Sequence, residues 1–213
     1  MKTVYFVRHG STEQLEARAW QLHDIPLSEK GRTQAISAAR RFQKIPIDII
    51  ITSEMERARE TARYISDATK TDVVESPLFH EILRPTVNRG KLHSDPIAWA
   101  LGQEVECNFE LGTTSKHSDE ENFYDLRDRA ISAIKFIEEY PEENICVVTH
   151  GTFLRMMLVI LLFGNEVTAQ QSYAIHRFFY PSNTGITTCT LEDTKWWLRT
   201  WNDDAHLGEV EEN

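Results

Sequence analysis

The chain has 213 residues, of which 41% are hydrophobic and 26% are charged. This length and balance fit one domain with a buried core and exclude a globally disordered chain. With 23 Lys and Arg against 33 Asp and Glu, the formal net charge is −10, which argues against a surface for nucleic acid or an anionic membrane, since phosphate backbones require a basic face. An anionic ligand therefore needs a local pocket of positive charge.

The cysteines and the apolar stretches indicate where the protein resides. Cys107, Cys146 and Cys189 are too few and too scattered for a disulfide framework or a cysteine-rich metal site, so free thiols in a reducing compartment are expected. No signal peptide is evident. The longest apolar stretch, 153–163, is interrupted by Arg155 and is about half the ~20 residues of a membrane span. We expect a buried helix there and a cytoplasmic protein.

The apolar pattern predicts strands and helices in alternation. Buried strands are predicted at Thr3–Val7, Asp48–Thr52, Asp72–Glu75 and Ile145–Thr149. Helices are predicted from the Ser28 cap to about Phe42, from about Glu54 to Ile65, from about Tyr124 to Tyr140, and directly after Gly151. The later runs Thr187–Glu192 and Trp196–Trp201 predict a terminal antiparallel pair.

Strands that alternate with helices indicate βαβ units, and hence an α/β fold: a three-layer α/β/α sandwich with a mostly parallel central sheet. We expect residues 1–213 to form a single domain. The segment from about 85 to 121 is weakly periodic and contains Gly90, Gly102 and Gly112. It is expected to be a long insertion over the active site, because such segments often shape a binding site.

Two of the predicted strands end in the same pattern. The first leads into Arg8-His9-Gly10 and the fourth into His150-Gly151, while the second opens a helix that carries Arg57 and Arg59. Because ligands bind beyond the carboxyl ends of the strands in an open α/β sheet, these ends are expected to converge. Two histidines and an arginine pair form an anion site in an otherwise acidic protein. No acidic cluster accompanies them, so we expect neither a metal nor another cofactor.

Five motifs follow one another along the chain. They are Val7-Arg8-His9-Gly10-Ser11-Thr12, the stretch from Asp24 to Ala35, the stretch from Ser53 to Ala62, Glu81, and Val148-Thr149-His150-Gly151. In type and order they resemble the histidine phosphatase (phosphoglycerate mutase-like) superfamily, and the resemblance covers nearly the whole chain. The tail from Trp201 to Leu207 resembles that of broad-specificity phosphatases in this group. The resemblance implies a phosphoglycerate mutase-like fold and a phosphatase-type member.

The resemblance also implies a role for each motif residue. His9 matches the nucleophile, which attacks phosphorus and becomes a phosphohistidine. Arg8 and Arg57 match residues that bind phosphate oxygens through their planar guanidinium groups, and His150 matches a donor to the transferring group. Glu81 matches the general acid and base. For this role we expect its pKa to be raised by partial desolvation near other carboxylates.

The chain departs from the family pattern around the expected pocket rim. After Arg8-His9-Gly10 the family commonly has Glu-Thr followed by Trp-Asn. Here Gln14 is expected to supply an amide to the substrate instead, with Gly151 beside His150 as a further substrate contact. Arg59 is expected to be an exposed or ion-paired helix residue. These departures concern the identity of the substrate more than the chemistry.

We therefore expect a metal-independent phosphomonoesterase that acts through phospho-His9 on a small phosphorylated metabolite. In the insertion, Arg84, Arg89 or Lys91 is available for a second anionic group. A phosphoglycerate mutase shares the clamp and is the first alternative, although the departures after Arg8-His9-Gly10 and Glu81 argue against it. A non-catalytic phospho-ligand binding protein is the second, and the filled chemical positions argue against it. A phosphatase for phosphohistidine proteins differs only in its macromolecular substrate. No motif specifies an oligomeric state.

Overall fold

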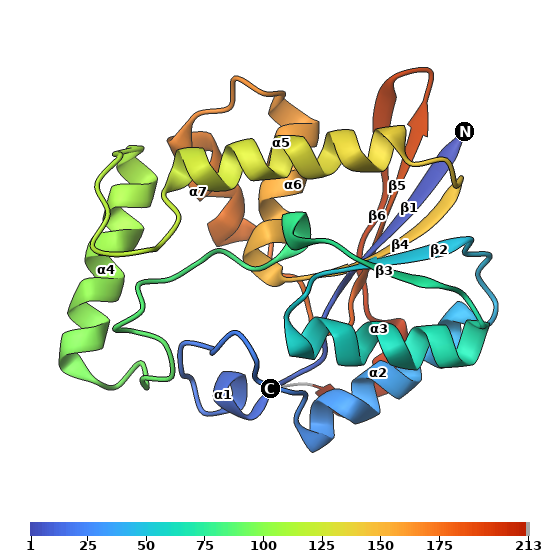
Figure 1. Ribbon diagram of the computed structural model, residues 1–213, viewed down its shortest axis with the longest axis horizontal. Helices are drawn as coiled ribbons and strands as arrows, with labels where there is room; N and C mark the ends of the chain where they lie inside the picture. The colour runs from blue at the N-terminus through green and yellow to red at the C-terminus, as the bar shows by residue number, and fades with distance from the viewer. Residues whose placement is uncertain (212–213) are drawn as a thin grey trace.

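A six-stranded sheet forms the centre of the computed structural model, which describes residues 1–211 (Figure 1). Its strands are β1 (Lys2–Arg8), β2 (Ile49–Thr52), β3 (Val73–Glu75), β4 (Asn144–Thr149), β5 (Ile186–Glu192) and β6 (Lys195–Asp203). They lie in the order β3-β2-β4-β1-β5-β6. The first four strands are parallel, whereas β5 pairs antiparallel with both β1 and β6. The predicted parallel sheet and its terminal antiparallel pair are confirmed.

Helices cover both faces of this sheet. They are α1 (Glu13–Glu16), α2 (Glu29–Phe42), α3 (Glu56–Thr69), α4 (Pro96–Leu111), α5 (Phe123–Glu139), α6 (Gly151–Phe163) and α7 (Ala169–Phe178), with the 3-10 helices η1 (Pro77–Phe79) and η2 (Ala205–Glu211). Figure 1 shows α5, α6 and α7 on one face and α2 and α3 on the other. The expected three-layer α/β/α sandwich is therefore confirmed.

Local chemistry explains the helix boundaries. The side chain of Ser28 accepts a hydrogen bond from the amide of Gly31, so α2 begins where its cap predicts. α3 begins at Glu56 rather than Glu54 and continues beyond Ile65 to Thr69, because the left-handed conformation that ends it comes only at Lys70.

The sequence analysis did not predict α4, which lies inside the 85–121 segment. The helix has clear ends: Asp95 caps its first amides, and Gly112 closes it with φ 67°. However, its apolar residues do not share one face, since Ile97 and Trp99 are exposed whereas Phe109 is buried. That distribution removes the periodicity by which an amphipathic helix is identified.

The core consists of two apolar layers, one on each side of the sheet. Successive strand residues face opposite ways, so Phe6 packs with Phe153 under α5 and α6, whereas Val7 packs with Ala62 under α2 and α3. The predicted helix over 153–163 is confirmed as part of α6, and it is buried as far as Ile160, whereas Leu162 and Phe163 at its end are exposed. Within residues 1–211 no helix has the length and apolar character needed to cross a membrane.

Two glycines hold the end of β1 against the start of α2. A Cβ on Gly31 would lie 2.0 Å from the carbonyl oxygen of Ser11, and a Cβ on Gly10 would lie 2.5 Å from the carbonyl oxygen of Gly31. Both obstructing atoms belong to the backbone and cannot rotate away. This close approach places His9 beside the first turn of α2 and requires glycine at both positions.

Substituting Gly31→Ala is accordingly expected to lower the free energy of unfolding by about 3 kcal/mol, the upper end of the range for overpacking. Urea denaturation measures this loss. Gly90 provides the control, since its φ is 78° and a Cβ there meets only side-chain atoms of Leu22, at an ordinary contact distance of 3.7 Å. Gly90→Ala is expected to cost about 1 kcal/mol from backbone strain alone. Equal losses in the two variants would contradict the close-approach explanation.

Candidate active site

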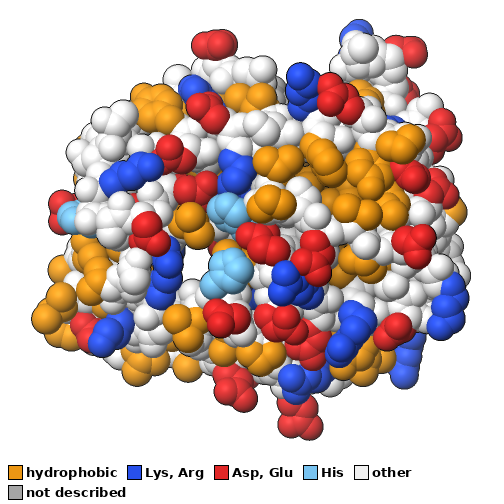
Figure 2. Space-filling model, in the orientation of Figure 1, with side chains coloured by type: hydrophobic (Ala, Val, Ile, Leu, Met, Phe, Trp, Pro, Cys, Tyr) orange, Lys and Arg blue, Asp and Glu red, His pale blue; other side chains and the backbone are white. Residues whose placement is uncertain are grey.

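The residues singled out in the sequence converge at the carboxyl edge of the parallel strands. His9 follows β1, Ser53 follows β2, and His150 follows β4. The rings of His9 and His150 lie 5.0 Å apart between centroids, and both histidines are buried. A cleft of about 350 Å³, lined by Arg8, Arg57 and Glu81 among others, opens at this edge. Figure 2 shows a deep hollow in the surface, with His side chains on one side and Lys or Arg side chains on the other.

The hydrogen bonds of His9 define its tautomer. Nδ1 lies 2.7 Å from the carbonyl oxygen of Gly10, and Nε of Arg57 donates to Nε2 over 3.2 Å. The ring proton therefore resides on Nδ1 and the lone pair on Nε2. Burial lowers the pKa of His9 well below its usual value, and the positive charges of Arg57 and Arg8 lower it further. His9 is thus a neutral imidazole with its nucleophilic nitrogen beside Arg57.

Arg57 is held by contacts on every side of its guanidinium group. Nη1 donates to the carbonyl oxygen of Leu22 over 2.9 Å, and Nη2 lies 3.0 Å from the sulfur of Met55. Burial lowers the pKa of Arg57 to about 10, although Glu81 opposes this shift. Arg57 stays positively charged at neutral pH, and its orientation is set before any ligand enters.

Two buried polar atoms near His9 have no hydrogen-bond partner within the described part of the chain. They are Nε of Arg8 and Nδ1 of His150. Elsewhere on these side chains, Nη1 of Arg8 donates to the carbonyl oxygen of Pro181 over 2.6 Å, and Nε2 of His150 lies 2.9 Å from Oγ of Ser53. Buried polar atoms normally have partners, and the oxygens of a phosphate group would provide them here.

Glu81 is bound to the start of α6. Its two carboxylate oxygens accept hydrogen bonds from the amides of Thr152 and Phe153, in the first turn of this helix, and from its neighbour Ile82, at 2.9 to 3.1 Å. Burial raises the pKa of Glu81, but these amide bonds, together with the nearby charges of Arg57 and Arg155, outweigh it, so the pKa lies below its usual value.

The expectation of a raised pKa for Glu81 is therefore wrong in this structure. The sequence analysis considered desolvation and neighbouring carboxylates, and desolvation does act in the expected direction. The contributions that reverse the shift are amides of α6 and the adjacent amide of Ile82, together with charges from α3 and α6. Apart from Ile82, these groups lie far from Glu81 in sequence. Glu81 is accordingly a carboxylate in the ligand-free site.

The other predicted site residues have structural surroundings of their own. A Cβ on Gly151 would lie 3.3 Å from Nε of Arg8, so glycine allows Arg8 to approach the start of α6. Gln14 lies outside the residues that line the cleft, and its side-chain oxygen accepts from the amide of Leu22 over 2.7 Å. It thereby holds the loop whose carbonyl oxygen binds Arg57. As a substrate contact, Gln14 stays a prediction.

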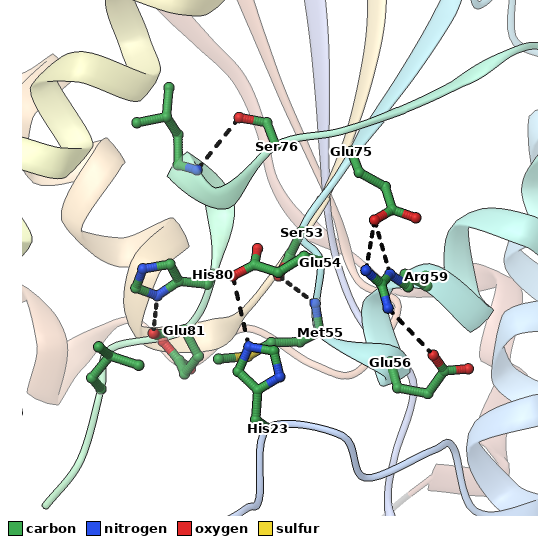
Figure 3. A network of polar contacts seen from close by, with 12 residues as sticks. His23, Ser53, Glu54, Met55, Glu56, Arg59, Glu75, Ser76, His80 and Glu81 are labelled. Atoms are coloured by element: carbon green, nitrogen blue, oxygen red, sulfur yellow. Dashed lines mark hydrogen bonds and ion pairs between the residues drawn. The ribbon is translucent and has the colours of Figure 1, made fainter.

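Arg59 is an ion-pair partner, as expected. Its guanidinium donates to Glu75 at 2.7 and 3.0 Å and lies 3.9 Å from Glu56. Figure 3 shows Arg59 between Glu75 and Glu56 and well apart from Glu81, with the ion pair of His23 and Glu54 between the two groups. Arg59 therefore takes no part in the cleft.

Several residues that shape the site were not identified from the sequence. Thr61 accepts from the amide of Gly10 over 3.1 Å, and Asn183 donates to the carbonyl oxygen of His9 over 2.8 Å. Tyr180 and Arg155 line the cleft. Two of these residues could have been found from the sequence. Thr61 lies within the motif from Ser53 to Ala62, and Arg155 is the charged residue that interrupts the apolar stretch 153–163. Asn183 and Tyr180 belong to the loop after α7, where no local pattern points to the site.

The 85–121 segment and the chain before α2 meet beside the cleft. The amide of Trp20 donates to the carbonyl oxygen of Lys91 over 3.0 Å, and the amide of Gly90 donates back to Trp20 over 2.7 Å. The rings of Trp20 and His93 lie 4.4 Å apart between centroids. Trp20 and His93 both line the cleft, so these two segments together form one of its walls.

No group of three or more His, Cys, Asp or Glu side chains in residues 1–211 is arranged to hold a metal ion. The cleft instead presents a neutral imidazole, fixed guanidinium groups and unpartnered donors, an arrangement suited to phosphoryl transfer. This combination on a three-layer α/β fold is typical of enzymes that act on phosphate groups. Residues 4–204 match the Histidine phosphatase superfamily (branch 1). The chain belongs to this family, and the resemblance seen in the sequence is confirmed.

Relatives with assigned names span two activities. The chain is 28% identical over 217 residues to the "Probable phosphoglycerate mutase GpmB" of Escherichia fergusonii, covering 97% of this chain and 95% of that protein. It is 25% identical over 209 residues to the "Uncharacterized phosphatase PhoE" of Bacillus subtilis, covering 97% of each. The solved mycobacterial glucosyl-3-phosphoglycerate phosphatase in complex with VO3 shares the fold, with a TM-score of 0.78 and 22% identity over 95% of this chain and 100% of that chain.

Proposed function

We propose that this phosphatase-family enzyme is a metal-independent phosphomonoesterase that acts through a phosphohistidine at His9. The observation that carries the proposal is the neutral, buried His9, with its Nε2 lone pair beside Arg57 and next to the unpartnered donors of Arg8 and His150. A phosphate group seated among these residues would have its oxygens bound and its phosphorus facing a nucleophile.

The first step is the attack of His9 Nε2 on phosphorus, which forms a P–N bond as the P–O ester bond breaks. Arg8, Arg57 and the Nδ1–H of His150 stabilise the charge on the equatorial oxygens. The Nδ1–H of His9 continues to donate to the carbonyl oxygen of Gly10. This hydrogen bond also stabilises the positive charge that develops on the ring. The departing alkoxide needs a proton.

Glu81 supplies that proton once substrate is bound. The carboxylate is ionised in the free site, but a phosphate group seated between Glu81 and His9 repels its charge and thereby raises its pKa. Glu81 then takes up a proton, either from solvent or from a substrate that enters as the monoanion, and passes this proton to the departing oxygen. After the alcohol leaves, Glu81 is again a carboxylate and takes a proton from the water that attacks phosphorus. The P–N bond breaks as the new P–O bond forms, which returns the lone pair to His9 Nε2 and releases phosphate. The bonds from the amides of Thr152 and Phe153 hold the carboxyl group in place through both steps.

The surroundings of the site support a small phosphorylated metabolite in the cytoplasm as the substrate. The net charge of −10 disfavours nucleic acid and anionic membranes as partners. Trp20, His93 and the neighbouring 85–121 segment wall the cleft, which favours a small molecule over the exposed side chain of a phosphoprotein. The three cysteines are free thiols, as suits a reducing compartment.

Hydrolysis of p-nitrophenyl phosphate in excess EDTA tests the proposal. Turnover that resists EDTA is expected, together with a radiolabelled enzyme intermediate that is stable to base and labile to acid, as a phosphoramidate is. Absence of turnover with every monoester would refute the phosphatase function. Conversion of 3-phosphoglycerate to 2-phosphoglycerate without release of phosphate would instead establish the mutase alternative. This alternative is tested because one relative is named as a probable phosphoglycerate mutase.

Substituting Glu81→Gln separates the two steps. For an alkyl phosphate such as glycerol 3-phosphate, kcat/KM is expected to fall by about 10²-fold or more, since the poor leaving group loses its acid. For p-nitrophenyl phosphate, kcat/KM is expected to change little, because p-nitrophenolate leaves without a proton. Its kcat should still fall, as water attack loses its base. Equal losses of kcat/KM for both substrates would remove Glu81 from the acid role.

A further inference from the structure

The cleft holds more positive charge than one phosphate group requires. Five arginines line it: Arg8, Arg57, Arg84, Arg89 and Arg155. In a chain with a net charge of −10, this concentration calls for local anionic partners. Arg8 and Arg57 flank His9 and serve the transferred phosphate. The remaining three therefore need to be explained from their own contacts.

Two of these three arginines are held by the protein itself. Arg89 donates from Nη2 to the carboxylate of Asp119 over 2.6 Å and from Nε to the carbonyl oxygen of Arg84 over 2.9 Å. Arg155 donates from Nε to the carbonyl oxygen of Gly151 over 3.0 Å, and from Nη1 to that of His176. These contacts fix the two side chains as parts of the cleft wall.

Arg84 differs from both. Within residues 1–211 its side chain makes no hydrogen bond or ion pair at contact distance, although burial lowers its pKa and Glu81 and Glu106 act on it electrostatically. The side chain is only half-buried where it lines the cleft, so its guanidinium donors are open to a ligand. A ligand that brings acceptors would form charge-assisted hydrogen bonds with them.

The position of Arg84 shows where such a ligand group lies. Arg84 lines the cleft that contains Arg8, Arg57 and Glu81, and it also lines an adjacent cavity of about 140 Å³ between α4, α6 and α7. The two spaces share Ile82, Thr152 and Arg155 besides Arg84. Arg84 therefore stands where the leaving group of a seated phosphomonoester would extend past Glu81.

We propose that Arg84 binds a second anionic group of the substrate, a carboxylate or a second phosphate carried by the leaving alcohol. The inference rests on the proposed phosphatase function and specifies its substrate class. The other two basic residues considered for a second anionic group, Arg89 and Lys91, are less available than Arg84. Arg89 is committed to Asp119, and Lys91 is exposed and does not line the cleft.

Matched substrates test the proposal. Glycerol 3-phosphate and 3-phosphoglycerate share a carbon skeleton and differ in the carboxylate, whereas fructose 6-phosphate and fructose 1,6-bisphosphate differ in the second phosphate. In one of the two pairs, wild type is expected to show a higher kcat/KM for the member that carries the second anionic group. The pair that shows this preference identifies the group as a carboxylate or a phosphate. Arg84→Gln is expected to reduce that preference by about 10- to 100-fold, the effect of a hydrogen bond to a charged group.

Two further variants give the comparison its control. Arg84→Lys keeps the charge and is expected to retain most of the preference. Lys91→Gln removes a positive charge from the same segment outside the cleft and is expected to leave every ratio unchanged. Wild type that shows no preference in either pair would overturn the proposal. So would Arg84→Gln lowering kcat/KM for both members of each pair equally, since Arg84 would then act on Glu81 rather than on a second anion.

Binding to His9→Ala distinguishes failure of this proposal from failure of the proposed function. Calorimetric titration of that variant with the same four ligands needs no turnover. Tighter binding of the more anionic ligand, lost on adding Arg84→Gln, would uphold the subsite even if wild type hydrolysed nothing. Equal affinities alongside normal turnover of p-nitrophenyl phosphate would reject the subsite and leave the phosphatase function standing.

Discussion

His9→Ala is expected to lower the turnover of p-nitrophenyl phosphate by about 10⁴-fold or more, since the substitution removes the atom that forms the covalent intermediate. The labelled phosphoenzyme should disappear with the activity. His117→Ala is the matched control, because His117 is an exposed histidine whose side chain lies 3.3 Å from Glu104, outside the cleft lining. Activity that survives in His9→Ala would show that the nucleophile is another residue. An equal loss in His117→Ala would show that the loss is not specific to His9 and would withdraw this support for the nucleophile.

The same variant has a stability signature. The pKa of His9 is lowered in the folded protein, so the unfolded chain takes up a proton as pH falls through about 6.5, the ordinary histidine value, while folded His9 stays neutral. Stability contributed by neutral His9 is thus present above this pH and is lost progressively below it. Wild type is expected to lose more unfolding free energy between pH 7 and pH 5 than His9→Ala does. Urea denaturation at the two pH values measures the difference.

Arg57→Gln is expected to lower kcat/KM by about 10²- to 10³-fold, the usual effect of removing one donor to transition-state charge. The pH profile of kcat/KM for this variant also reports the effect of Arg57 on the pKa of His9. Burial is the main cause of the low pKa of His9, and the charge of Arg57 adds to it. Removing that charge raises the pKa of His9, so the neutral nucleophile is lost at a higher pH. The acid limb of kcat/KM should therefore move upward toward neutral pH.

Arg57→Lys separates charge from shape. It keeps a positive charge near His9 and loses the planar group that donates to the carbonyl oxygen of Leu22. Its rate is expected to be reduced, but its acid limb should remain close to that of wild type. An acid limb that stays in place in Arg57→Gln as well would mean that Arg57 does not influence the protonation of His9.

The sequence by itself determined the architecture and the principal groups of the site. Buried parallel strands and their covering helices leave continuous apolar runs and a helical period, so β1, β2, β4, α2, α5 and α6 were located from local pattern alone. The convergence of Arg8-His9-Gly10, Arg57 and His150 follows from the rule that parallel strands end at one edge of the sheet. These inferences succeed because each depends on residues close together in the chain.

Only the tertiary structure decided the protonation state of Glu81 and the partners of the arginines. The carboxylate is stabilised by amides of Thr152 and Phe153, about a third of the chain away, and no local pattern reports such a contact. The same holds for Asn183, which reaches His9 from the loop after α7. It also holds for two arginines of the cleft wall: Arg89 pairs with Asp119, whereas Arg84 has no such partner among residues 1–211. Charge state and pairing depend on distances across the fold, and those distances are set by packing.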